Sequence, residues 1–257
     1  MAEIDPASWN NLFGTDYPFT RHEFLLALEQ GGSTIPDNGW QPRHAVLYRD
    51  DVAIAAAPLF IKDHSWGEYV FDWSWADAFN RHGLSYYPKL LCAIPFTPAT
   101  GPGIAVAHQE DAATLVPGMM ATLSEFCREQ ELSSFHLLFP AAQAADNMTI
   151  PGIIRRRGSQ FHWFNRNYES FDHFLSSLNS RKRKSLRRER RRVAEQGIEL
   201  RVLSGTEISA EDWRKFYRFY QLTYAKRSGH GGYLTLESFL AIGRSMPEQV
   251  VMILAGC

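Results

Sequence analysis

The residues from Arg181 to Arg192 form the densest concentration of charge in the chain. Nine of these twelve positions are Lys or Arg and one is Glu, so the segment carries a charge of +8. Because the whole chain has a formal charge of −1, the remaining residues carry −9. Clusters of Lys and Arg this dense are typical of surfaces that bind phosphates. The segment therefore predicts contact with a polyanion through Arg181, Lys182, Arg183, Lys184, Arg187, Arg188, Arg190 and Arg191.

Apolar residues within and beside this basic segment recur at helical spacing. Leu178, Leu186 and Val193 lie eight and seven residues apart, which places one narrow apolar stripe on an otherwise cationic helix. We expect Ser180 to cap the start of this helix and Gly197 to end it. Like charges four residues apart each cost about 0.2–0.5 kcal/mol. The pairs are Arg183 and Arg187, Lys184 and Arg188, Arg187 and Arg191, and Arg188 and Arg192.

Such self-repulsion is explained most simply if a polyanion, or acidic residues elsewhere in the fold, neutralises the helix. RNA phosphates fit this density of Lys and Arg better than lipid or small phosphates do. The alternative is a solvated helix face with no partner.

A second group of polar and aromatic side chains lies between Trp66 and Thr100, in a long insertion of a compact domain. An Asp carboxylate there could orient or deprotonate an amine, a Lys could hold an anionic group, and aromatic rings could stack on a sugar or a base. We therefore predict Asp72 and Asp77 as catalytic residues. The predicted substrate-binding residues are Trp73, Trp75, His82, Tyr86, Tyr87, Lys89 and Thr97, with Glu68 also able to line the pocket.

The alternative for these residues is structural. Carboxylates near strand ends often cap or brace a loop, so Asp72 and Asp77 could support the insertion while Trp73 and Trp75 fill the core.

The remaining His and Cys residues give weaker signals. His136 and His162 occur in apolar segments and are predicted to be buried core histidines. Cys92, Cys127 and Cys257 are widely spaced, and no His lies at ligand spacing from them, so neither a disulfide framework nor a metal site is predicted. No Ser-His-Asp or Cys-His arrangement is visible, which fits direct attack without a covalent enzyme intermediate.

Helical and strand patterns alternate through the first two thirds of the chain, which predicts one mixed α/β domain over residues 1–168. A turn at residues 49–51 should join two antiparallel strands. The expected elements are helices at 20–30 and 111–130, and strands or extended segments at 44–48, 52–62, 68–73, 89–96, 135–139, 153–157 and 160–164.

A second domain is predicted over residues 169–257. It opens with a helix from Ser170, continues into the basic helix and a strand at 198–203, and includes a helix whose capping pattern runs from Ser209 to Asp212. A helix at 235–244 and a strand at 249–255 follow. A final strand with no hairpin partner after it suggests a domain that is cut short.

Composition limits the class of protein. The chain has 257 residues, of which 45% are hydrophobic and 13% aromatic, enough for one large or two modest cores. The longest apolar stretch, at residues 52–61, is broken by Pro58 and is too short to cross a bilayer. The N-terminus lacks the basic and apolar regions of a signal peptide. We therefore expect no transmembrane segment and a soluble, cytoplasmic chain.

The order of elements resembles tandem domains of the Gcn5-related N-acetyltransferase (GNAT) type, with mixed, mainly antiparallel sheets and an incomplete second domain. More specifically, the chain resembles the FemAB-like group of that superfamily, described as peptidoglycan biosynthesis or recognition proteins. The resemblance covers nearly the whole chain and rests on residues 67–73 with 75–77, 86–90, 95–98 with 100–102, 160–163, and 180–184 with 187–190.

The resemblance implies an acyltransferase that uses either an acyl-CoA or an aminoacyl-tRNA as donor co-substrate. Binding of CoA pyrophosphate needs consecutive backbone N–H groups before a helix. Residues 98–103, 155–160 and 226–231 only approach that pattern, and Pro98 and Pro102 each remove an N–H donor. Fem-type enzymes transfer an aminoacyl group from tRNA to an amine of a cell-wall precursor, and such a donor suits the +8 helix better. An acetyl-CoA-dependent N-acetyltransferase and a non-catalytic binder of RNA or wall precursor remain the alternatives.

Overall fold

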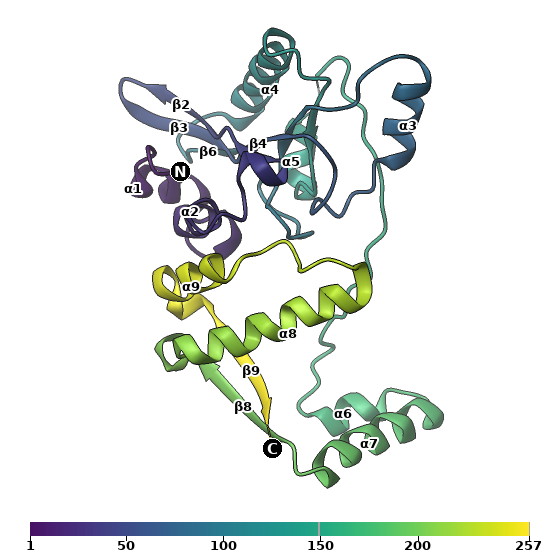
Figure 1. Cartoon of the computed structure of the whole chain (residues 1–257). Helices are drawn as coiled ribbons and strands as arrows, with labels where there is room; N and C mark the ends of the chain where they lie inside the picture. The colour runs from purple at the N-terminus through teal and green to yellow at the C-terminus, as the bar shows by residue number, and fades with distance from the viewer. Residues whose placement is uncertain (149, 257) are drawn as a thin grey trace. The chain divides into compact units, whose positions relative to one another are not determined.

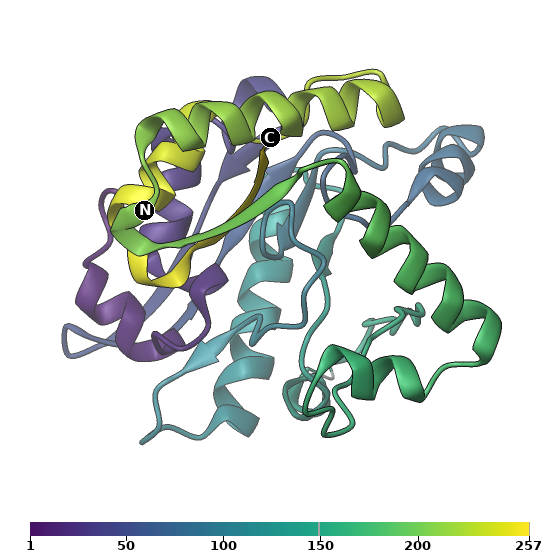
Figure 2. The ribbon, with the colours of Figure 1, turned by 90° about the horizontal axis from the view of Figure 1, so that it is seen from below.

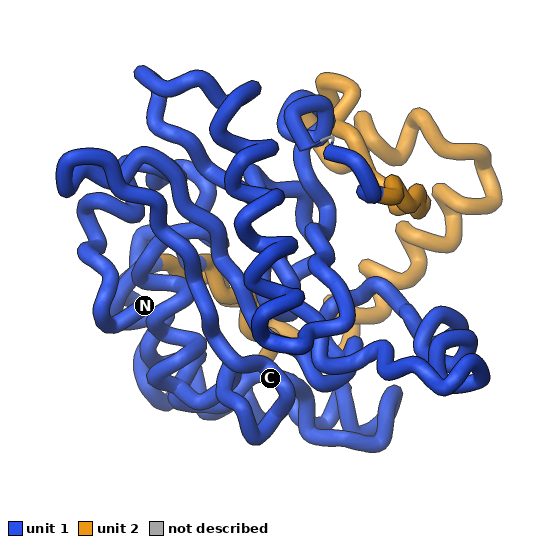
Figure 3. The backbone as a smooth tube through the Cα atoms, turned by 90° about the horizontal axis from the view of Figure 1, so that it is seen from above, with its two compact units in different colours: residues 1–153, 205–250 blue, residues 154–204, 251–257 orange. Residues whose placement is uncertain are grey.

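The computed structural model describes residues 1–148 and 150–256, so Cys257 lies outside it. The chain forms two compact units (Figure 3). Unit 1 comprises residues 1–153 and 205–250, and unit 2 comprises residues 154–204 and 251–257. We expected domains at 1–168 and 169–257. The compact units divide the chain differently, because residues 205–250 group with the N-terminal segment.

Unit 1 contains two sheets, which are mixed and mainly antiparallel as expected (Figure 1). The four-stranded sheet has the order β1, β4, β5, β7, and only its β5–β7 pair is parallel. The three-stranded sheet has the order β2, β3, β6. Their bounds are β1 Trp40–Pro42, β2 Ala45–Arg49, β3 Val52–Ala57, β4 Leu59–Lys62, β5 Lys89–Cys92, β6 Ala105–Val106 and β7 Phe135–Leu137.

One predicted strand is two strands in the structure. The expected strand at 52–62 divides at Pro58 into β3 and β4, which belong to different sheets. Proline has no backbone N–H for a ladder and is therefore found at strand ends. The predicted hairpin is confirmed: β2 and β3 pair antiparallel, and the turn residues Asp50 and Asp51 adopt left-handed φ values of 48° and 62°.

Side chains cap the starts of the two longest helices of unit 1, α4 and α8. Asp111 accepts from Ala113 N at the start of α4, and Ser209 and Asp212 form the predicted capping box of α8. These side chains satisfy N–H groups that a helix start leaves unpaired. The bounds are α1 Pro6–Phe13, α2 His22–Gln30, α3 Trp73–Arg81, α4 Ala112–Glu129, α5 Ala142–Asn147, α8 Ala210–Ser228 and α9 Leu236–Ser245. Short 3-10 helices lie at Pro18–Thr20, Pro36–Asn38, Gly205–Glu207 and Pro247–Gln249.

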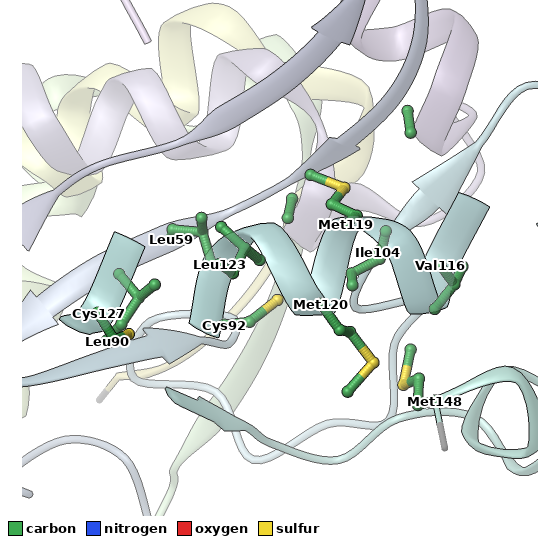
Figure 4. Packing of buried hydrophobic residues seen from close by; sticks show 12 residues of the cluster. Leu59, Leu90, Cys92, Ile104, Val116, Met119, Met120, Leu123, Cys127 and Met148 are labelled. Carbon is green, nitrogen blue, oxygen red and sulfur yellow. The ribbon is translucent and has the colours of Figure 1, made fainter. Parts of the chain in front are cut away.

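Two apolar clusters form the core of unit 1, and β5 contributes to both. Leu90 and Cys92 belong to a cluster that includes Met120 and Leu123 of α4 (Figure 4). Leu91, between them, belongs to a second cluster that contains Trp9, Phe13 and Leu25 from α1 and α2. Successive side chains of a strand point to opposite faces, so β5 is covered on both sides.

A close contact between α2 and α9 explains why residues 205–250 join the N-terminal segment. Ser33 Oγ lies 2.6 Å from Ser238 Oγ, and Thr235 Oγ1 donates to the carbonyl of Gly31 at 2.6 Å. A side chain at Gly31 would overlap Ser238, with a Cβ only 2.5 Å from the Ser238 Cα. The two helix ends can meet at this distance only because residue 31 is glycine.

Unit 2 holds the basic helix and a two-stranded ribbon. Its helices are α6 Phe171–Ser176 and α7 Ser180–Glu195, and its strands are β8 Glu199–Ser204 and β9 Val251–Gly256. The strands pair antiparallel from Glu199↔Gly256 to Ser204↔Val251 and lie side by side in Figure 2. β9 is therefore paired with a strand that precedes it in the chain.

Several local predictions were wrong. The segment at 68–73 is a loop that leads into α3. The segments at 153–157 and 160–164 form no strand, because within the described residues neither has a hydrogen-bonded neighbouring strand. His162 consequently lies exposed and is not a core residue. Asn179, one residue before Ser180, caps α7 by accepting from Lys182 N at 2.9 Å. Among the described residues, no helix is both long and apolar enough to cross a membrane.

Candidate functional sites

The first candidate site surrounds Lys89, which is fully buried at the start of β5. Its Nζ donates to Glu68 Oε2 at 2.8 Å, to Asp72 Oδ2 at 2.8 Å and to Ser65 Oγ at 3.1 Å. The side chains of Glu68 and Asp72 are also inaccessible to solvent. The anions that Lys89 holds in this structure are thus two carboxylates of the protein itself. We call Ser65, Glu68, Asp72 and Lys89 the lysine cluster.

The lysine cluster places two carboxyl groups, of Glu68 and Asp72, beside one ammonium group, and burial changes how readily Glu68 ionises. Burial raises the pKa of Glu68, and the nearby Lys89 ammonium opposes that rise. Within the described part of the chain, Glu68 Oε1 is buried without a hydrogen-bond partner. Asp72 Oδ2 lies 3.9 Å from His136 Nδ1. A desolvated carboxylate gains proton affinity, so Glu68 releases its proton less readily than an exposed Glu.

Sequence reasoning missed a second buried lysine. Lys62 of β4 is directly opposite Lys89 in the antiparallel β4–β5 ladder, and both are fully buried. Lys62 Nζ donates to the carbonyls of Gly39 at 2.8 Å and Trp66 at 3.4 Å, and lies 3.9 Å from the centroid of the Trp40 ring. Burial lowers the pKa of Lys62 to about 7, and the Lys89 charge contributes in the same direction. The sequence shows a Lys at one end of each apolar strand. Whether the two lysines face each other depends on the register of β4 and β5, which only the structure shows.

Two predicted aromatic residues lie against the lysine cluster. Tyr87 OH is 2.7 Å from Ser65 Oγ. Tyr86 is buried, and its ring makes edge contacts with Tyr87 at 5.0 Å and His136 at 5.8 Å. The structure therefore brings together four of the predicted residues, with Asp72, Tyr86 and Lys89 buried and Tyr87 half-buried.

The other predicted residues of this group lie nearer the surface. Asp77 of α3 is exposed and pairs with Arg81 at 2.9 Å. His82 ends α3, with Nδ1 2.8 Å from the carbonyl of Ala78, and Thr97 Oγ1 donates to the carbonyl of Pro95 at 3.1 Å. Asp72 and Asp77 thus occupy opposite environments, one buried and one open to solvent.

The predicted indoles do not fill the core. Trp73 and Trp75 are 42% and 43% exposed. Trp73 contacts Trp66, with ring centroids 5.0 Å apart. Aromatic side chains this exposed are available to a ligand.

The second candidate site is the cationic surface of α7. Of its predicted anion-binding residues, Arg183 is half-buried, and Arg181, Lys182, Lys184, Arg187, Arg188, Arg190 and Arg191 are exposed. Within unit 2, Arg187 pairs with Asp172 at 3.3 Å, and the Arg190 guanidinium lies 4.2 Å from the centroid of the Phe171 ring. An exposed ion pair of this kind contributes at most about 1 kcal/mol, so Arg187 can exchange it for a phosphate.

The N-terminal half of α7 lines an open hollow of about 540 Å³. Its walls are Asn179, Arg181, Lys182, Lys184, Ser185 and Arg188, all from one helix or its cap. In the described part of unit 2, no ion pair is formed by Arg181, Lys182, Lys184 or Arg188. This side of the helix presents four cations to an incoming anion. The apolar stripe is only half-buried at Leu178 and Leu186, and Val193 is exposed.

A phosphate site at the start of α4 is disfavoured by the structure. The Asp111 carboxylate accepts from Ala113 N and from Thr114 Oγ1, so an anion of the protein already occupies the helix start. Among residues 1–148 and 150–256, no group of three His, Cys, Asp or Glu side chains is arranged as a metal site.

Comparison with known proteins identifies the family to which the chain belongs. A family model described as peptidoglycan biosynthesis/recognition, FemAB-like, matches residues 1–256. No curated protein matches in sequence. A solved structure entitled "Crystal structure of FemX" aligns with 97% of this chain and 56% of that chain, at 13% identity and a TM-score of 0.45. The chain therefore spans little more than half the length of that structure.

Proposed function

Because the chain belongs to the FemAB-like family of peptidoglycan biosynthesis and recognition, we propose that it acts as an acyltransferase in that process. It would transfer an aminoacyl or acyl group to an amine of a peptidoglycan precursor. The observation that carries the donor assignment is the exposed cationic surface of α7. We propose that this surface binds the phosphates of an aminoacyl-tRNA.

The density of free cations favours tRNA over CoA as the donor. Arg181, Lys182, Lys184 and Arg188 line one open hollow and form no ion pair within the described part of unit 2. A single CoA offers few phosphates, whereas a tRNA backbone offers one at every nucleotide. Lys and Arg contacts to phosphate supply affinity without reading sequence, which suits a donor that is recognised by its charge.

The proposed reaction is aminolysis of an ester. The acceptor nitrogen attacks the carbonyl carbon, a C–N bond forms, and the ester C–O bond breaks. The nitrogen loses one proton, and the departing ribose oxygen gains one. Of the two carboxylates predicted to assist, Asp77 is accessible to solvent, whereas Asp72 is held by Lys89 in the core. We therefore favour Asp77 as the residue that orients the amine, and we assign Asp72 to bracing the loop.

Recognition without catalysis is the second candidate. It is favoured by the burial of Glu68, Asp72 and Lys89, which removes three of the most reactive side chains of the first unit from contact with a substrate. An acetyl-CoA-dependent enzyme has less support, because Asp111 occupies the start of α4.

Charge reversal on α7 tests the donor assignment. Lys184→Glu with Arg188→Glu reverses two exposed cations in the hollow, four residues apart. Arg214→Glu with Arg218→Glu on α8 is the matched control, because it makes the same change in net charge at the same spacing and exposure. In a filter-binding assay with aminoacyl-tRNA, we expect the α7 variant to bind at least tenfold more weakly and the control to bind within about twofold of wild type.

Three other results would contradict parts of this proposal. Equal loss in both variants would mean that only net charge matters. Saturable CoA binding with no RNA binding would replace tRNA by CoA as the donor. Binding of tRNA and precursor with no transfer in a single-turnover assay would leave recognition as the function.

A further inference from the structure

Two exposed indoles of the first unit lie against each other: Trp73, a predicted substrate-binding residue, and Trp66, which the sequence did not single out. Trp66 and Trp73 are 50% and 42% exposed, their ring centroids are 5.0 Å apart, and their planes meet at 58°. Large aromatic side chains usually lose most of their exposed area on folding. An open, V-shaped pair of indoles is therefore a candidate ligand surface.

The backbone of Trp66 is fixed from inside the protein. Its carbonyl accepts from Trp40 Nε1 at 3.2 Å and from the buried Lys62 Nζ at 3.4 Å. The next residue, Gly67, has a left-handed φ of 80°, and a Cβ there would lie 2.6 Å from the Phe96 ring. The loop is consequently held against the core while the Trp66 side chain faces solvent.

The lysine cluster anchors the rest of the loop. Glu68 and Asp72 turn inward to Lys89, each at 2.8 Å, and Asp72 directly precedes Trp73. Exposing indoles while burying charges reverses the usual distribution of side chains, and both choices cost free energy. Such an arrangement is expected where the exposed rings serve binding.

The charge around the pair indicates the class of ligand. Residues 63–80 contain no Lys or Arg, and their carboxylates Glu68 and Asp72 are buried against Lys89 while Asp77 pairs with Arg81, so little net charge surrounds the indoles. A nucleic acid or an anionic membrane surface is recognised with clustered cations, which this segment lacks. A ligand with a flat, uncharged face fits better, and the C–H face of a sugar ring stacks on indoles in this way.

From these observations we propose that Trp66 and Trp73 form a saccharide-binding site for an N-acetylated sugar ring. The choice of an N-acetylated sugar rests on the proposed function, because the glycan of peptidoglycan consists of such sugars. Asp77, the residue proposed to orient the acceptor amine, lies one helical turn after Trp73 on α3, so the amine would be held beside the bound sugar. The site would hold the glycan part of the acceptor and leave its amine free to react.

Calorimetric titration with an uncharged, peptide-free tetramer of N-acetylglucosamine tests this proposal. We expect Trp66→Ala and Trp73→Ala each to weaken binding about tenfold, and Trp73→Phe to retain part of the affinity. The control is Trp163→Ala, which removes another exposed indole, at 65% exposure, from unit 2. It should bind the tetramer as wild type does. Circular dichroism verifies that each variant is folded.

Several results would overturn the proposal. They are no binding by the folded wild-type protein, unchanged binding by both alanine variants, or equal loss in the Trp163 control. Binding to phosphatidylglycerol vesicles without binding to the tetramer would assign the pair to a membrane, and a dimer lost in the Trp66 variant would assign it to a second copy. Filter binding of tRNA by the Trp66 and Trp73 variants should stay at the wild-type level. The tRNA assay therefore tests the donor assignment independently of the saccharide site.

Discussion

Replacement of the buried lysine tests how the loop at residues 65–72 is held. Lys89→Met keeps an apolar stem of similar length but removes the ammonium that pairs with both Glu68 and Asp72. Breaking a buried ion pair by removing one partner costs about 3–5 kcal/mol, because the other charge stays buried and uncompensated. Domains of this size unfold with about 5–15 kcal/mol, so the variant should lose a large part of its stability.

The loss of folding stability in Lys89→Met should depend on pH. Without Lys89, the pKa of Glu68 should rise further above its ordinary value, because burial already raises it and the Lys89 ammonium opposes that rise. The folded state then binds more protons than the unfolded state between the ordinary and the raised pKa, and stability falls as the pH rises through that window. The loss relative to wild type should therefore be smaller at pH 5 than at pH 8.

Guanidinium unfolding followed by circular dichroism at both pH values measures the effect. Lys215→Met is the matched control, because Lys215 forms an exposed pair with Glu211 at 3.5 Å, and such pairs contribute at most about 1 kcal/mol. Adding Glu68→Gln and Asp72→Asn to Lys89→Met should restore part of the stability. If Lys89→Met unfolds within about 1 kcal/mol of wild type at pH 8, our reasoning about the lysine cluster is wrong.

Two further predictions concern the same unit. Gly31→Val should destabilise the protein by about 3 kcal/mol or more, because the new side chain would overlap Ser238 at the α2–α9 contact. The control Gly118→Ala, on α4 with open space around it, should be neutral or stabilising by up to about 1 kcal/mol. Thermal unfolding compares the two variants, and equal stability would contradict the packing argument. The pKa of Lys62 is lowered to about 7 in the folded state, so the unfolded state binds more protons above pH 7 and wild-type stability should rise by up to about 1.4 kcal/mol per pH unit from pH 7 to 9. Lys62→Met should remove this rise, and an unchanged slope in denaturant titrations would show that Lys62 titrates normally.

Local signals in the sequence predicted most helices and the main hairpin. The Ser209 to Asp212 capping box starts α8, and Asp111 starts α4, because caps depend on residues within three positions. The hairpin of β2 and β3 follows from a short turn between two apolar runs. These features need no knowledge of distant parts of the chain.

Features that depend on register or on distant segments were not predictable in this way. Lys62 and Lys89 face each other only because β4 and β5 pair in one register, which also closes Lys89 off from solvent. The contact of Gly31 with Ser238 joins residues about 200 positions apart. The basic run of α7, by contrast, was visible as a charge pattern, and the fold leaves most of it exposed.

The salt dependence of tRNA binding tests the central claim most directly. Each phosphate neutralised by Lys or Arg lowers the logarithm of the association constant by about 0.7–0.9 per tenfold rise in salt. The account predicts a steep slope for the wild-type protein and a slope shallower by about 1.4–1.8 for Lys184→Glu with Arg188→Glu, with the Arg214 and Arg218 control unchanged. A wild-type slope near zero, or the same slope in all three proteins, would contradict the assignment of α7 as the tRNA-binding surface.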